Sequence, residues 1–165
     1  MELNSRVVAA EGVVHGWLVR HSIRLLRISL GAVFLGFGFL KYFPGVSPAQ
    51  DLTVTTTRLL TFGLIPDHLG LVLVATLECV IGLVLIAGRG LRGIVYLLTL
   101  ELAGILSPVV LLPGRLFSGP YHAPTLEGQY VLKDVILVAA AMVVATGFRG
   151  ARISLPEPGP VSDRG

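Results

Sequence analysis

Charge is scarce in this sequence of 165 residues. Charged residues make up 14% of the chain, as 13 Lys and Arg and 10 Asp and Glu, whereas a soluble domain carries about 25%. Hydrophobic residues make up 53%, and the mean hydropathy is +0.81. Because a small soluble domain keeps much of its surface in water and needs polar cover there, this composition argues against a soluble globular protein and favours a membrane protein.

Cysteine and the common catalytic motifs are also scarce. Cys79 is the single cysteine, which excludes an intrachain disulfide, a CxxC pair and a cysteine-rich metal site. The sequence has no glycine-rich phosphate loop, no zinc-ligand spacing and no Ser-His-Asp order. The four histidines fall outside the apolar segments, so no metal site is predicted. The basic residues are spread along the chain rather than gathered into one patch, which argues against nucleic acid as a partner.

Long apolar segments are what the chain does have. A membrane-spanning helix needs about 20 mostly apolar residues. Four segments meet this length, at about residues 25–43, 69–88, 91–112 and 130–148. A Gly-Arg-Gly turn alone separates the second from the third, which predicts a tight antiparallel hairpin. We therefore predict an all-α membrane protein, built as a bundle of four transmembrane helices.

This segmentation divides the chain into three regions. Residues 1–23 are moderately apolar but too interrupted to span, and Trp17 suits the headgroup zone, so we expect an N-terminal interfacial amphipathic helix. Residues 24–148 form the four-helix bundle, and residues 48–62 in its first outer loop predict a short amphipathic helix. Residues 149–165 are rich in Pro and Gly, and we expect a disordered cytoplasmic tail.

The distribution of Lys and Arg predicts the orientation. Nine of the 13 basic residues flank one side of the predicted bundle, and the other side has Lys41, Arg58, Arg115 and Lys133. Cytoplasmic loops of membrane proteins carry an excess of Lys and Arg. We therefore expect a multi-pass protein of the cell membrane with both termini in the cytoplasm.

Two carboxylates lie deep in the predicted spans. Glu78 precedes the turn between the second and third spans by about 11 residues, and Glu101 follows it by about 11, so both lie about 17 Å from the turn, near the midplane. Small residues share their helix faces, which predicts that both point into the bundle. Ionisable groups at this depth are costly and suggest a function. We expect a ligand or proton-relay site, with interhelical packing of neutral carboxyl groups as the alternative.

A second group of charged residues lies at the predicted outer boundary. Lys41 ends the first span, and Lys133 and Asp134 open the fourth, so antiparallel spans bring them to one level. We expect an ion pair between Lys41 and Asp134, with Glu127 from the preceding loop as a further partner. The alternative is that the lysines extend to water, which suits Lys133.

Three segments carry short motifs that together suggest a family. They are RISLGAVFLGFGFLK at residues 27–41, Glu78 followed by Ile81-Gly82-Leu83, and GQYVLKD at residues 128–134. These resemble the first, second and fourth helices of DoxX-like membrane proteins, and the last also resembles a related four-span family linked to reactive-chlorine resistance. The resemblance covers about residues 24–148. It implies a four-helix membrane bundle that works with redox proteins, as in thiosulfate:quinone oxidoreductases or in assemblies with superoxide dismutase.

The residues and the resemblance leave three functions open. The first is an accessory or anchor subunit in respiratory or oxidative-stress chemistry that binds quinone, or another lipid-soluble ligand, near Glu78 and Glu101. Its partners would be soluble or membrane-bound redox proteins. The second is a small proton, cation or solute transporter, formed as a homo-oligomer. The third is a structural scaffold for a membrane complex. The sequence favours an accessory role over a self-sufficient enzyme.

Overall fold

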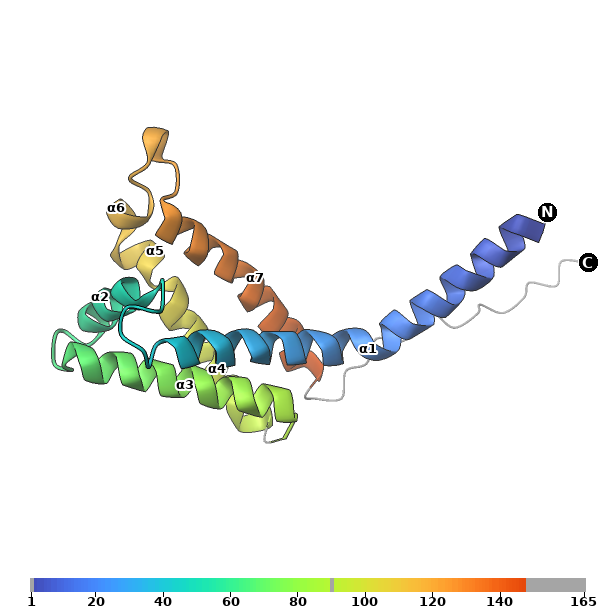
Figure 1. Ribbon diagram of the computed structural model, residues 1–165, viewed down its shortest axis with the longest axis horizontal. Helices are drawn as coiled ribbons and strands as arrows, with labels where there is room; N and C mark the ends of the chain where they lie inside the picture. The colour runs from blue at the N-terminus through green and yellow to red at the C-terminus, as the bar shows by residue number, and fades with distance from the viewer. Residues whose placement is uncertain (1, 90, 148–165) are drawn as a thin grey trace, which may run out of the picture.

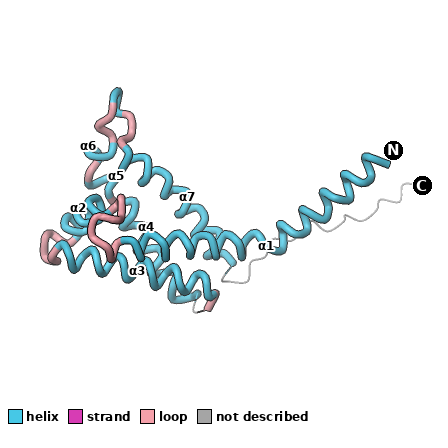
Figure 2. Tube along the Cα trace, in the orientation of Figure 1, coloured by secondary structure: helices cyan, strands magenta, loops and turns pink. Residues whose placement is uncertain are grey.

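The computed structural model describes residues 2–89 and 91–147, and the regular structure of these residues is entirely helical. Figures 1 and 2 show the helices in sequence order. They are α1 (Glu2–Leu40), α2 (Gln50–Leu60), α3 (Asp67–Ala87), α4 (Leu91–Leu106), α5 (Pro108–Leu111), α6 (Pro113–Leu116), the short 3₁₀ helix η1 (Pro120–His122) and α7 (Leu126–Gly147). The tail predicted for residues 149–165 lies outside the described residues.

Among the residues that the structure describes, four segments are long and apolar enough to cross a membrane: Ala10–Leu40, Asp67–Ala87, Gly93–Leu111 and Pro120–Thr146. This confirms the prediction of an all-α membrane protein with a four-helix bundle. Helices are favoured in lipid because each backbone N–H group finds its carbonyl partner within the same segment. In Figure 1, α1 runs along α3, and α7 approaches α1 at an oblique angle.

Glycine allows α1 and α3 to pack closely along their shared face. A Cβ atom added to Gly82 would lie 2.6 Å from the backbone nitrogen of Leu35 and 2.7 Å from the carbonyl oxygen of Gly31. Small residues at such contacts let the backbones of membrane helices approach each other. Phe34 and Ile81 continue this contact into the apolar core of the bundle. This close contact therefore sets the alignment of α1 along α3.

The N-terminal half of α1 differs from the prediction. A separate interfacial helix was expected over residues 1–23 and a span over 25–43, but α1 is one continuous helix from Glu2 to Leu40. No proline interrupts this segment, and an interior glycine costs only about 1 kcal/mol, so nothing in it forces a break. The first half of α1 extends away from the bundle (Figure 1). At the other end, Lys41 already lies in a turn.

The end of α1 lies beside the middle of α3. Arg27 lies against Gly88, directly after α3, where a Cβ atom on the glycine would meet the guanidinium group. From Arg27 to Lys41, α1 rises about 21 Å, whereas α3 is about 31 Å long. The helix α2 packs against the remaining part of α3, with Thr57 next to Gly70. Lys41 therefore lies well inside the bundle.

Pro108 divides the third predicted span into α4 and α5. Proline has no backbone N–H group to donate to the carbonyl of Gly104, four residues earlier. The hydroxyl group of Ser107 donates to that carbonyl instead, at 2.7 Å. The chain can therefore bend here without leaving the carbonyl unpaired, and Pro108 is buried.

The predicted helix in the first outer loop is present as α2. One of its two buried residues is Leu52, which packs in a small cluster with Leu116 and Val131. The other buried residue is Thr56. This helix therefore belongs to the bundle and presents a polar residue to its interior.

Candidate functional site

Lys41 and Glu78 form an ion pair inside the bundle. Lys41 follows α1, Glu78 lies in the middle of α3, and the close contact of α3 with Gly38 brings the two side chains together. The Lys41 Nζ atom donates hydrogen bonds to both carboxylate oxygens of Glu78, at 2.7 Å and 2.6 Å. The two side chains are only 5% and 7% exposed.

The partner of Lys41 corrects the prediction from the sequence. An ion pair between Lys41 and Asp134 was expected, on the assumption that α1 crosses the full length of the bundle. Since α1 ends beside the middle of α3, the ammonium group meets Glu78 instead. The two groups that the sequence analysis placed at different depths, Lys41 and Glu78, are therefore in direct contact.

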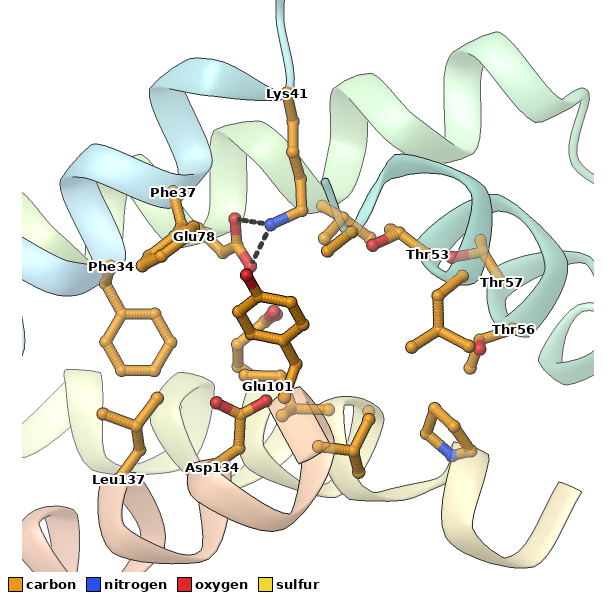
Figure 3. Close-up of a pocket in the computed structure, with 18 of the residues that line it drawn as sticks. Phe34, Phe37, Lys41, Thr53, Thr56, Thr57, Glu78, Glu101, Asp134 and Leu137 are labelled. Carbon is orange, nitrogen blue, oxygen red and sulfur yellow. Dashed lines mark hydrogen bonds and ion pairs between the residues drawn. The ribbon is translucent and has the colours of Figure 1, made fainter. Parts of the chain in front are cut away.

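Glu101 of α4 and Asp134 of α7 line the same cavity as this ion pair (Figure 3). Glu101 is buried and Asp134 is half-buried. Within residues 2–89 and 91–147, no hydrogen bond joins either carboxyl group to another side chain or to the backbone. The predicted inward orientation of Glu78 and Glu101 agrees with their burial. The site thus combines one paired and two unpaired carboxyl groups.

The cavity has a volume of about 210 Å³ and lies between α1, α2, α3, α4 and α7. Figure 3 shows Phe34 and Leu137 at one end, threonines of α2 at the other, and Glu101 and Asp134 between them. Most of the other lining side chains are apolar, including Phe37. A mostly apolar cavity with a few convergent polar groups is the usual form of a small-molecule site.

Threonines of α2 form a polar wall that the sequence analysis missed. Thr53, Thr56 and Thr57 all line the cavity. Their spacing of three and four residues places them on one face of a helix. That spacing was visible in the sequence, but the segment was assigned to an outer loop, where threonines are common. Their contribution to the site depends on the packing of α2 against α3, which the sequence does not specify.

Arg115 joins α2, α6 and α7 outside the cavity. Its Nε and Nη2 atoms donate to the two carboxylate oxygens of Glu127, both at 2.6 Å, and Nη2 also donates to Asp51 at 2.5 Å. The hydrogen bonds to Glu127, and then those to Asp51, raise the pKa of Arg115 above its usual value. The prediction that Glu127 joins Lys41 is therefore wrong, because Glu127 pairs with Arg115 of α6 instead.

Lys133 lies apart from the cavity. Its Nζ atom is 5.5 Å from the centre of the Tyr130 ring, within the range of a cation–π contact. The side chain is exposed, which agrees with the alternative that Lys133 extends toward water. In the described part of the chain, no three His, Cys, Asp or Glu side chains are grouped so that they could hold a metal ion.

The cavity could exchange protons or hold a ring-shaped apolar molecule. A neutral carboxyl group donates one hydrogen bond and accepts others, whereas a carboxylate only accepts. Glu101 and Asp134 can therefore meet either an oxygen acceptor or a donor on a ligand. The Lys41–Glu78 pair supplies a fixed dipole at the wall of the same cavity.

Comparisons with known proteins do not assign a chemical function to this site. No family model matches the chain, and no curated protein or solved structure matches it either. The resemblance to DoxX-like proteins therefore stays a prediction from short motifs. The described residues include four helical segments that are long and apolar enough to span a membrane, and a cavity with polar side chains lies within their bundle.

Proposed function

We propose that this protein binds a quinone in the cavity beside Lys41 and Glu78, and that it serves as an accessory or anchor subunit of a redox assembly. The observation that carries this proposal is the pair of carboxyl groups of Glu101 and Asp134, which face an apolar cavity without hydrogen-bond partners in the described part of the chain. Unpaired polar groups in an apolar site are costly until a ligand or water satisfies them. A quinone carbonyl accepts a hydrogen bond from a neutral carboxyl group.

The apolar lining supports a ring-shaped ligand that arrives through the lipid. Phe34 and Phe37 of α1 offer aromatic surface to a flat ring. The cavity also lies among helices that are apolar enough to span the bilayer, so its ligand has to be soluble in lipid or reach it from the outer loops. Both properties suit a quinone with an apolar tail.

The proposed redox partners and membrane location are supported by the sequence. The motifs at residues 27–41 and 128–134 support membership of the DoxX-like proteins, which work with redox partners. In this proposal the partner proteins supply the electrons, and the chain holds the quinone at the membrane. The excess of Lys and Arg on one side supports cytoplasmic termini in the cell membrane.

Binding of a decyl-substituted para-benzoquinone to the purified protein in detergent tests the proposal. We expect Glu101→Met and Asp134→Leu each to weaken binding about tenfold, because each removes one hydrogen bond of about 1–1.5 kcal/mol from the site. The exposed Glu11 of α1 offers a matched control, and Glu11→Met should leave the dissociation constant unchanged. Wild-type protein that fails to bind the quinone, or equal binding by all variants, contradicts the proposal.

Proton translocation is a second candidate, favoured by a specific observation. Four ionisable side chains, Lys41, Glu78, Glu101 and Asp134, line one cavity inside the bundle, and such groups within membranes often form proton relays. Proteoliposomes loaded with a pH-sensitive dye distinguish this function from quinone binding. A proton flux that Glu101→Met abolishes, without quinone binding, would replace the first candidate with the second.

A further inference from the structure

The hydroxyl group of Thr56 is buried and lacks the local hydrogen bond that several other threonines of this protein make. The hydroxyl groups of Thr55, Thr61, Thr76 and Thr99 each donate to the carbonyl four residues earlier, at 2.7–2.8 Å. The Thr56 Oγ1 atom is buried and has no partner among the described residues. Thr56 as a whole is only 5% exposed.

An unpaired hydroxyl group at this depth is unfavourable. Threonine in a helix usually satisfies its hydroxyl group locally, as Thr55 and Thr99 do here. A buried hydroxyl group without that bond has lost its water and gained nothing in return. We therefore expect the Thr56 hydroxyl group to form a hydrogen bond with a bound ligand.

The position of Thr56 indicates which other side chains a ligand bound to its hydroxyl group would contact. Thr56 lines the cavity from α2, while Glu101 and Asp134 line it from α4 and α7. In Figure 3 the threonines lie across the cavity from the two carboxyl groups. The cavity thus has unpaired polar groups on two sides, separated by a mostly apolar space.

We propose that Thr56 binds the second oxygen of a ring ligand that carries two oxygens on opposite sides, while the first oxygen meets the carboxyl groups of both Glu101 and Asp134. This inference rests on the proposed function and specifies its ligand class as para-quinones and their hydroquinones. A ring with a single oxygen would satisfy the carboxyl groups and leave Thr56 unpaired.

A hydroxyl group suits both redox states of such a ligand. It can donate to the carbonyl oxygen of a quinone, and it can accept from the hydroxyl group of a hydroquinone. The carboxyl groups of Glu101 and Asp134 have the same double capacity, because they donate when neutral and accept in either state. The Thr56 Oγ1 atom has almost no accessible surface in the empty cavity, so binding requires a rotation of this side chain about χ1. The site can then hold the ring before and after reduction.

A comparison of two probes tests this role of Thr56. One probe is a decyl-substituted para-benzoquinone, and the other is a decyl-substituted cyclohexenone, which keeps the six-membered ring and the tail but has one oxygen. We expect Thr56→Val to raise the dissociation constant of the quinone about fivefold, as for the loss of one hydrogen bond, and to leave that of the cyclohexenone unchanged. Thr56→Ser keeps the hydroxyl group and should restore quinone binding.

Thr99→Val is the matched control, since Thr99 is exposed on α4 and bonded to its own helix. It should change neither dissociation constant. If wild-type protein binds the quinone and Thr56→Val binds it equally well, the role of Thr56 is refuted while the proposed function stands. If Thr56→Val weakens both probes alike, the hydroxyl group does not recognise a second oxygen, and the inference also fails. If wild-type protein binds no quinone, both proposals fail together.

Discussion

The buried ion pair of Lys41 and Glu78 makes the sharpest prediction about stability. At the observed 2.7 Å, two unit charges attract each other by roughly 6 kcal/mol at an effective dielectric constant of about 20. Much of this attraction offsets the cost of removing both groups from water. Removal of one partner leaves the other charge buried and unpaired, which typically costs about 3–5 kcal/mol. We therefore expect Lys41→Met and Glu78→Met each to destabilise the protein by about 3 kcal/mol or more.

The double variant distinguishes a true pair from two separate polar residues. Two methionines fill a similar volume without charge, and exchange of a buried ion pair for apolar side chains is often neutral. We expect Lys41→Met/Glu78→Met to be less destabilised than either single variant. Their coupling energy in a double-mutant cycle should be about 3 kcal/mol or more, because the cycle isolates the interaction between groups in contact.

Unfolding in mixed micelles of dodecyl maltoside and sodium dodecyl sulfate, followed by circular dichroism, measures these free energies. The exposed Glu11 and Arg20 of α1 provide matched controls, and Glu11→Met and Arg20→Met should each stay within about 0.5 kcal/mol of the wild type. Strictly additive effects of the two core substitutions, with a coupling below about 0.5 kcal/mol, would refute the ion pair as described.

Three further predictions concern packing, the outer contacts and orientation. Gly82→Ala should destabilise the bundle by about 2–3 kcal/mol, because the new Cβ atom would stand 2.6 Å from a backbone nitrogen of α1. Gly36→Ala, with no atom within 4 Å, should be neutral or stabilising by up to about 1 kcal/mol in the same unfolding assay. Arg115→Met should cost about 1–2 kcal/mol and increase hydrogen exchange in α2, since its bonds are partly exposed. In a Cys79→Ser background, Tyr121→Cys should react with an impermeant maleimide from outside intact cells; labelling only after lysis would reverse the orientation.

The sequence predicted the number and nature of the helices well, because lipid allows few alternatives to a spanning helix. Apolar length alone therefore located the second and third spans to within a few residues, whereas the first and fourth begin earlier in the structure than predicted. The break at Pro108 was not predicted, although proline in an apolar run is its visible cause.

The pairing within the site could not be predicted, because hydropathy locates a helix but says nothing of its depth relative to its neighbours. The sequence analysis placed Lys41 at the outer boundary, since it follows an apolar segment. Its true level depends on the contact of Gly31 with Gly82, which aligns the end of α1 with the middle of α3. The position of α2 depends on the same alignment. For this reason Thr56 was also missed.

The cost of the polar side chains is the strongest argument that the cavity has a function. The apolar clusters and the glycine contact between α1 and α3 are sufficient reasons for the helices to associate. By contrast, a buried ion pair stabilises a fold no better than apolar side chains of similar size. Thr56 adds a buried hydroxyl group without a partner in the described part of the chain, which is a further cost in the empty state. Glu101 and Asp134 place two more carboxyl groups in the same mostly apolar cavity. A ligand that satisfies these groups should therefore stabilise the protein more strongly than its apolar contacts alone would allow.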